Sequence, residues 1–372
     1  MLTTVADIIK TMETIAPPWL AEKWDNVGLQ IGQKEWSVKT IWIALDPSYD
    51  VVHDACSHGV DLLITHHPLI FQPLKSINLN TGVGSIIQMA IRHQMAIFSA
   101  HTNLDSVTDG LNDVLANRIG LKNLRVLGKS KDTEIYKLVV YVPSKYEQVV
   151  LKSIFETRAG EIGPYTCCTF RNNGKGTFRP GPSAKPFSGQ IDETSAADEI
   201  RIETVVQKKD LDEVIEHIEK KHPYETMAYD LYPLVPFESQ QGLGRIGELD
   251  ESIDLASFAL SIKKKLGLST VKIAGNLDLP VTIAAMCAGS GSSLMDDFFS
   301  SGAHVYVSGD LRYHDARSVE AANLGLIDIG HFASEHLIVE VLRDRLSVCL
   351  NETGIDVEVE ACRLENDPFV RL

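Results

Sequence analysis

The sequence predicts a mixed α/β fold in which a two-part α/β domain is interrupted by an inserted α+β domain. In the first third of the 372-residue chain, short apolar runs alternate with amphipathic helical segments. A segment of different texture, residues 129–242, follows and contains a long Gly/Pro/Asn-rich tract, and beyond it the first pattern returns. Domain insertion is tolerated where chain ends lie close together at a surface. We therefore expect residues 1–128 plus 243–372 to form one α/β domain. Residues 129–242 are expected to form an α+β domain that is inserted into it.

The N-terminal part contains three predicted strands separated by helices. Apolar side chains at helical spacing predict a first helix over 3–15, capped by a threonine. Uninterrupted apolar runs predict buried strands over 41–45, 60–65 and 95–100, with helices over 48–58 and 84–94 between them. Strands that alternate with helices in this way are typical of a mostly parallel sheet.

The middle segment follows the order strand, helix, loop, strand, helix, strand. The predicted strands are 137–143, 200–207 and 228–234, and the tract 160–189 is predicted as a loop because Gly, Pro and Asn dominate it. Residues 171–189 contain four basic side chains and no acidic one: Arg171, Lys175, Arg179 and Lys185. A solvated loop explains them, and an anion-binding flap is the functional alternative.

The C-terminal part returns to the α/β pattern. It contains a predicted helix over 255–267, predicted strands over 281–289, 303–310 and 325–330, and a long apolar helix from residue 334 to 348. A Gly/Ser turn at 289–293 offers backbone N–H groups to an anion, although a plain tight turn explains it as well.

The charge balance limits the classes of function. Thirty-five Lys and Arg residues against fifty Asp and Glu residues leave a net charge of −15. The electric field of this negative net charge repels phosphate backbones and disfavours generic nucleic-acid binding. No apolar run reaches the roughly 20 residues that a bilayer span needs, and the N-terminus does not match a signal peptide. The six cysteines are scattered along the chain, which favours reduced thiols over a disulfide framework. Because thiols stay reduced in the cytosol, we expect a cytoplasmic protein.

Histidines and carboxylates follow three predicted strands directly. Ligands of open α/β sheets bind at the carboxyl ends of the strands, so these segments are expected to converge on one crevice. Imidazole and carboxylate groups in this number suffice for two divalent metal ions, with Zn, Fe, Mn, Co and Ni as the metals that the mixed ligands suit. The residues are His66 and His67 after 60–65, His101 and Asp105 after 95–100, and His331 and Glu335 after the strand that ends near 330.

Each of these pieces also has a structural explanation when it is taken alone. A buried histidine pair after a strand is often structural, Asp105 suits a helix N-cap, and His331 with Glu335 suits a surface histidine and a capping carboxylate. Structural residues rarely supply His or carboxylate at three strand ends together, and the joint pattern therefore favours a metal site.

Two further groups of residues leave alternatives open. Asp310 and His314 follow the strand 303–310 and suit partners that orient metal ligands, but Asp310 suits a helix cap equally well. The Trp24–Asp25–Asn26 stretch suits a turn with its indole packed on the core, and the functional alternative is a wall of the pocket.

The motifs WDNVGLQIG, ITHHPLIF, SAHTNLD, SGDLRYHDA and DIGHFASE occur in the order found in one family. They resemble the GTP cyclohydrolase 1 type 2 homologues, also called Ngg-one-interacting-factor-three-like (NIF3-like) proteins. The middle segment, with GEIGPYTCCTF, GTFRPGPSAKPFSG and HPYETMAYDLYPL, resembles the inserted PII/CutA-type (ferredoxin-type) domain of the longer bacterial members.

The resemblance implies a dinuclear metal centre and assembly into a ring-shaped homohexamer. It implies His66, His67, Asp105, His331 and Glu335 as metal ligands, with His101 beside the metals. Because the ordinary pKa of histidine suits proton transfer near neutral pH, His101 is the candidate for that role.

Two functions are compatible with these residues. The first is a metal-dependent hydrolase that acts on a nucleotide or a related heterocycle, by opening the purine ring of GTP or by cleaving a phosphoester. The second is a non-enzymatic, metal-holding ring that binds partners, in which the inserted domain senses a ligand.

Overall fold

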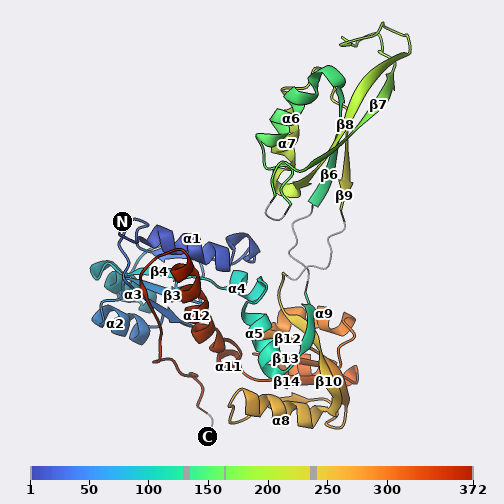
Figure 1. Ribbon diagram of the computed structural model, residues 1–372. Helices are drawn as coiled ribbons and strands as arrows, with labels where there is room; N and C mark the ends of the chain where they lie inside the picture. The colour runs from blue at the N-terminus through green and yellow to red at the C-terminus, as the bar shows by residue number, and fades with distance from the viewer. Residues whose placement is uncertain (1, 129–134, 163–164, 235–240, 371–372) are drawn as a thin grey trace. The chain divides into compact units, whose positions relative to one another are not determined.

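The computed structural model describes residues 2–128, 135–162, 165–234 and 241–370. The chain divides into two compact units, one made of 1–131 with 239–372 and the other of 132–238 (Figure 1). Sequence analysis expected the insert at 129–242, and its predicted start at residue 129 lies outside the described residues. Within the described parts of the chain, no helix combines the length and the apolar character that crossing a membrane requires.

The first unit contains a five-stranded sheet in the order β1-β4-β3-β2-β15. Strands β2, β3, β4 and β15 run parallel, and β1 pairs antiparallel with β4. The three central strands carry the apolar runs that predicted them, and every residue of β3 and β4 is buried. The bounds are β1 Gly28–Ile31, β2 Thr40–Ala44, β3 Leu62–Thr65, β4 Ala96–Ser99 and β15 Glu358–Ala361, with helices α1 Val5–Ile15, α2 Tyr49–Ser57 and α3 Gly82–Arg92.

The same unit contains a six-stranded sheet in the order β11-β14-β13-β12-β10-β5. Its three central strands are parallel, and β11, β10 and β5 pair antiparallel at the sides. Because β5 precedes the insert and all the other strands follow it, both parts of the chain build this sheet. The bounds are β5 Lys122–Val126, β10 Arg245–Asp254, β11 Lys272–Ala274, β12 Pro280–Ser290, β13 Val305–Gly309 and β14 Gly325–Asp328.

One hydrophobic core joins the two sheets of the first unit. It contains Ile41 and Leu62 from the first sheet, Met286 and Val307 from the second, and Leu346 from α12. The helices of this part are α4 Thr102–Ser106, α5 Leu111–Ile119, α8 Leu255–Lys265, α9 Met295–Ser300, α10 Tyr313–Ala321, α11 His331–Glu335 and α12 Leu337–Glu352. The long helix predicted over 334–348 is divided in the structure into the end of α11 and most of α12. The shared core fixes the ends of β3, β4 and β14 relative to one another.

A buried ion pair reinforces this core. The Arg245 side chain from β10 donates two hydrogen bonds to the carboxylate of Asp113 in α5. Further bonds go to the carbonyl oxygens of Val107, Gly242 and Gly244, and only 2% of Arg245 is exposed. A buried guanidinium requires such full pairing, since removing one partner would leave an uncompensated charge.

The second unit has the element order β6-α6-β7-β8-α7-β9. Its antiparallel sheet has the order β7-β8-β6-β9, which is the arrangement of the split βαβ motif. The two helices contribute Val150, Ile154, Val214 and Ile218 to its core. The bounds are β6 Ile135–Pro143, α6 Glu147–Phe155, β7 Thr169–Phe178, β8 Ser195–Gln207, α7 Leu211–Glu219 and β9 Tyr229–Pro233.

The prediction of a loop over the whole tract 160–189 is wrong. Residues Thr169–Phe178 form a ten-residue strand that pairs with β8 from Thr169↔Thr204 to Phe178↔Ser195. Gly and Asn have low strand propensity, but the hydrogen-bond ladder with β8 overcomes that low propensity here. Pairing with a strand that is distant in the sequence leaves no local pattern by which β7 could be predicted.

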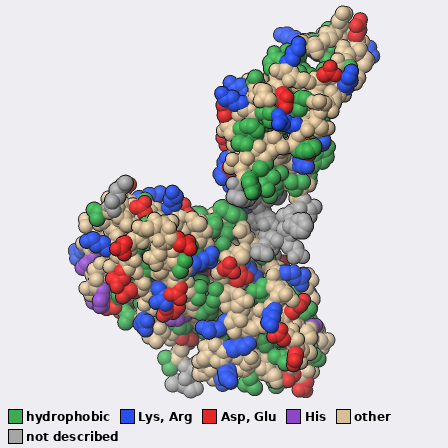
Figure 2. All heavy atoms as spheres, viewed as in Figure 1, with side chains coloured by type: hydrophobic (Ala, Val, Ile, Leu, Met, Phe, Trp, Pro, Cys, Tyr) green, Lys and Arg blue, Asp and Glu red, His purple; other side chains and the backbone are tan. Residues whose placement is uncertain are grey.

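Two of the four basic residues of this tract lie beside acidic side chains. Arg171 pairs with Glu147 at 2.6 Å, and Lys175 lies 3.7 Å from Asp198. Among the described residues, the face drawn in Figure 2 shows basic and acidic side chains interspersed rather than gathered into a basic stripe.

Candidate metal centre

Four histidines converge between the two sheets of the first unit. His66 and His67 follow β3, His101 follows β4, and His331 begins α11 just after β14. The ring centroids lie 5.2 Å apart for His66 and His67, 5.1 Å for His66 and His101, and 5.4 Å for His67 and His331. The strand ends of both sheets therefore meet at one place, as ligand sites of open α/β sheets do.

Two carboxylates lie among these rings. Asp105 Oδ1 is 3.5 Å from His66 Nε2. Glu335 Oε1 is 3.8 Å from His66 Nε2, and its Oε2 is 3.0 Å from His67 Nε2 and 2.9 Å from His331 Nε2. His66, Asp105 and Glu335 are all buried, with 1%, 9% and 4% of their surface exposed. Glu335 thus faces histidines from both sheets with its two different oxygens.

The Nδ1 atom of each histidine is held from outside the cluster. His66 Nδ1 lies 3.0 Å from the carbonyl oxygen of Ala100. The other three pair with carboxylates: His67 with Asp46 at 2.7 Å, His101 with Asp25 at 2.9 Å, and His331 with Asp310 at 2.7 Å. Histidines that bind metal characteristically donate their second ring N–H in this way, which sets the orientation of the ring.

Two buried polar atoms at the centre of the cluster lack a hydrogen-bond partner: His66 Nε2 and Asp105 Oδ1. Because a carbonyl oxygen can only accept, His66 must carry its proton on Nδ1, and neutral His66 therefore presents a lone pair at Nε2. A buried acceptor that faces carboxylate oxygens is costly without a cation. This set of donor atoms fits a metal ion.

The pKa values of the cluster show how strongly it attracts positive charge. Burial lowers the pKa of His67, but hydrogen bonds with Asp46 and Glu335 outweigh it and raise the pKa to about 10. A hydrogen bond with Glu335 raises the pKa of His331 to about 9, against the effect of burial. Burial raises the pKa of Asp105. Burial also acts to raise the pKa of Glu335, but the neighbouring histidines outweigh it and hold that pKa well below its usual range.

Two groups of side chains in this cluster could hold a metal ion. The first is His66, His67 and His101, and the second is His67, His331 and Glu335. Within each group the ligand atoms lie within 4.8 Å of one another. The groups share His67, and its Nε2 is the one ring nitrogen left to bind an ion, because Asp46 holds Nδ1.

Of the other residues that sequence analysis singled out, Asp310 contacts the cluster through His331. It does not cap the helix, since α10 begins at Tyr313 with Arg312 as its N-cap. His314 is exposed in α10, where its ring lies 5.5 Å edge-on from Tyr313, and its described contacts do not reach the cluster. The expected supporting role of His314 therefore has no contact behind it.

Two alternatives for single residues are also decided. Asp105 is not a helix N-cap, because it lies inside α4, whose N-cap is His101. The turn at 289–293 instead makes room for Glu335: Gly289 has φ +66°, and a Cβ there would collide with Glu335 Oε1. The Gly289 N–H donates to Ser334 Oγ at 2.8 Å, so it is already used within the protein.

Asp25 and Asp46 have roles that the sequence patterns did not indicate. The Asp25 side chain is fully buried, and it accepts hydrogen bonds from Thr102 as well as pairing with His101. Asp46 comes directly after the strand predicted over 41–45, and this position was the signal that could have identified it. Trp24 does not pack on the core: it is 59% exposed, and its ring centroid lies 6.0 Å from that of His101.

A cavity of about 520 Å³ opens beside the second group of ligands. Its lining includes His67, His331, Asp46 and Asp310. Lys272 also lines it, with its Nζ 3.1 Å from Asp328, and the C-terminal residues 367–370 close one side. This volume lies in the range of small-molecule sites.

Comparisons with known proteins identify the family of this chain. The family model described as Duf34/NIF3 (NGG1p interacting factor 3) matches residues 3–368. Two curated relatives are named "GTP cyclohydrolase 1 type 2 homolog". The one from Halalkalibacterium halodurans is 37% identical over 362 residues, 97% of each chain, and the one from Bacillus subtilis is 37% identical over 365 residues, 98% of each.

Solved structures are similar over the whole chain. The Staphylococcus aureus protein SA1388 gives a TM-score of 0.84 at 31% identity and covers 100% of this chain and 99% of its own. The Bacillus cereus protein related to NIF3 gives a TM-score of 0.76 at 35% identity, with 100% of both chains covered. The family resemblance seen in the motifs is confirmed.

Proposed function

This chain belongs to the Duf34/NIF3 family, and from that premise we propose that it is a dinuclear metal-dependent hydrolase of a nucleotide or a related heterocyclic substrate. The observation that carries the proposal is the cluster of four histidines and two buried carboxylates, which contains two possible ligand groups. In two-metal sites the ions activate water and polarise the bond to be cleaved. The proposed metals are Zn, Fe, Mn, Co or Ni, which mixed imidazole and carboxylate ligands suit.

We propose Glu335 as the bridging ligand. Its Oε1 faces His66 of the first group, and its Oε2 faces His67 and His331 of the second. Charge supports two ions rather than one, because five carboxylates surround the four histidines and two divalent ions would offset four of the five negative charges. These carboxylates are Asp25, Asp46, Asp105, Asp310 and Glu335.

The other side chains hold and orient the ligands. Asp25, Asp46 and Asp310 keep the Nδ1 atoms of three histidines occupied, so that the opposite ring nitrogens face the centre. Sequence analysis offered His101 for proton transfer. Because His101 lies in the first ligand group with its Nδ1 held by Asp25, we propose that it binds metal together with His66 and Asp105.

The hydrolase proposal is tested by turnover. Metal-loaded wild-type protein and the His66→Ala/His67→Ala variant are assayed against GTP and a panel of phosphoesters. We expect at least one substrate to be turned over by the wild type and not by the variant. The hydrolase assignment fails if the wild type is no faster on any substrate, and the site assignment fails if the variant keeps its full metal content.

A second candidate function is a non-enzymatic, metal-holding ring whose inserted domain senses a ligand. It is favoured by the separate core and the separate cavity of the insert. We propose a PII/CutA-type fold for this domain, supported by its split βαβ order and antiparallel sheet. We also propose a homohexamer, which native mass spectrometry of the full chain would detect as six copies in one particle.

A further inference from the structure

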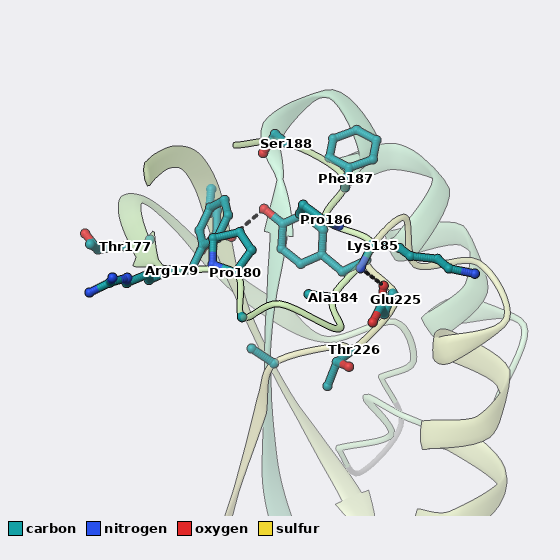
Figure 3. Close-up of a pocket in the computed structure, with 16 residues that line it drawn as sticks. Thr177, Arg179, Pro180, Ala184, Lys185, Pro186, Phe187, Ser188, Glu225 and Thr226 are labelled. Atoms are coloured by element: carbon teal, nitrogen blue, oxygen red, sulfur yellow. Dashed lines mark hydrogen bonds between the residues drawn. The ribbon is translucent and has the colours of Figure 1, made fainter. Parts of the chain in front are cut away.

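The inserted unit contains a cavity of about 370 Å³. It lies between the end of β7, the loop that follows it through Ser188, and the segment 224–228 that precedes β9 (Figure 3). All of its lining residues belong to the inserted unit, so this cavity is separate from the metal centre. A volume of this size suits a small molecule.

One wall of the cavity is aromatic. The rings of Phe187 and Tyr224 lie 5.9 Å apart, and the outer side of Phe187 is backed edge-on by Tyr146 at 5.5 Å. Phe187 is nevertheless 49% exposed. A half-exposed ring held in a cavity wall offers its face to a planar ligand, because stacking removes apolar surface from water.

The wall also presents carboxylates in defined places. The Tyr224 hydroxyl donates to Glu199 Oε1 at 2.7 Å, and the Lys185 backbone N–H donates to Glu225 Oε2 at 2.7 Å. A Cβ at Gly176 would collide with the Glu199 carboxylate, so the missing side chain at 176 provides the space for it. Glu199 is thus a positioned acceptor beside an aromatic surface.

Four charged residues line the cavity, the acidic Glu199 and Glu225 and the basic Arg179 and Lys185. In Figure 3 the side chains of Arg179 and Lys185 extend away from the centre of the pocket. Arg171 and Lys175 pair instead with Glu147 and Asp198. The interior therefore favours a ligand that donates hydrogen bonds and carries positive charge.

We infer that this cavity binds a small planar cation with paired N–H donors, such as an amidinium or a protonated amino-heterocycle. Its ring stacks on Phe187, with the tilted Tyr224 ring beside it, and its N–H groups bond to the Glu199 carboxylate. A carboxylate that accepts two parallel N–H bonds gives both strength and orientation to such a contact. The inference does not depend on the chemistry of the metal centre.

Three probes of one shape and different charge test it: benzamidine is cationic, benzamide is neutral and benzoate is anionic. Each is titrated into the full-length protein by ligand-observed NMR. We expect benzamidine to bind with a dissociation constant of about 1 mM or lower and benzoate not to bind. Equal or tighter binding of benzoate, or no binding of benzamidine, would overturn the inference.

Variants locate the binding to this cavity. Glu199→Gln is expected to weaken benzamidine binding about tenfold or more, since it removes a charge-assisted bond. Gly176→Ala should weaken it as well, by displacing the Glu199 side chain while keeping its charge. The matched control is Glu213→Gln, an exposed glutamate in the first turn of α7 that lies outside the cavity lining.

The variants must first show unchanged circular dichroism and thermal melting. If Glu199→Gln does not fold, Gly176→Ala and Phe187→Ala decide the question. Benzamidine affinity equal to wild type in the folded cavity variants, or lost equally in Glu213→Gln, refutes the assignment.

Discussion

Replacing Glu335 by alanine is expected to empty both proposed metal positions at once. Its Oε1 lies 3.8 Å from His66 Nε2, and its Oε2 lies 3.0 Å from His67 Nε2 and 2.9 Å from His331 Nε2. It is therefore the carboxylate that both ligand groups approach. The substitution removes this ligand and leaves the surrounding histidines in place.

The expected magnitude follows from the burial of Glu335. Its side chain is 5% exposed, so water cannot replace the lost oxygen ligands well. Residues that only orient a metal ligand cost about 10–100-fold in metal affinity when they are removed. Loss of a shared ligand should exceed that range, which means more than about 100-fold, or about 2.7 kcal/mol, for each metal.

The assay is the metal content of each protein after dialysis, measured by inductively coupled plasma mass spectrometry. Wild type should retain about two equivalents per chain, as expected for a two-metal site. His331→Ala should lose the metal of the second group, and His101→Ala that of the first. Glu335→Ala should retain neither.

A control on the neighbouring helix separates metal loss from general damage. Glu340 is an exposed residue of α12 that pairs with Arg343 at 2.6 Å, and Glu340→Ala should leave the metal content unchanged because surface pairs contribute little. If Glu335→Ala keeps two equivalents, or if His331→Ala loses as much metal as Glu335→Ala does, the assignment of Glu335 as a bridge is refuted.

Three further predictions follow from the same contacts. Asp46→Ala should weaken metal binding about 10–100-fold without abolishing it, as isothermal titration would show, because Asp46 holds His67 Nδ1. Metal affinity should rise with pH above neutrality, since the pKa values of metal-free His67 and His331, about 10 and about 9, mean that protons must leave before the metal binds. The slope should be about tenfold per pH unit for each proton displaced, and an affinity independent of pH would contradict it. Arg245→Ala should lower the free energy of unfolding by about 3–5 kcal/mol in urea denaturation, because it leaves the buried Asp113 carboxylate unpaired, and a loss below 1 kcal/mol would show that water replaces the guanidinium.

The central strands and the main ligand residues could be predicted from local patterns. The apolar runs of β2, β3 and β4 are continuous because these strands are buried on both faces. His66, His67 and His101 were singled out because each directly follows such a run. The position of a residue at a strand end is a local property, and sequence periodicity reports it.

Strands defined by long-range pairing could not be predicted in the same way. The β7 strand contains Gly174 and Gly176 and exists through its ladder with β8. The short β15 near the C-terminus pairs with β2 from Glu358↔Thr40 onwards, more than three hundred residues away along the chain. The glycines of β7 argued against a strand there, and no residue near β15 identified β2 as its partner.

The sequence by itself determined that histidines and carboxylates stand at three strand ends, because hydrophobic periodicity is local. Only the tertiary structure decided which of them meet, since the two sheets come together through one non-local core. It also decided which nitrogen of each ring faces the centre, by placing Asp25, Asp46 and Asp310 behind His101, His67 and His331. The donor atoms of a metal site are set by these distant partners, and their positions depend on packing rather than on order along the chain.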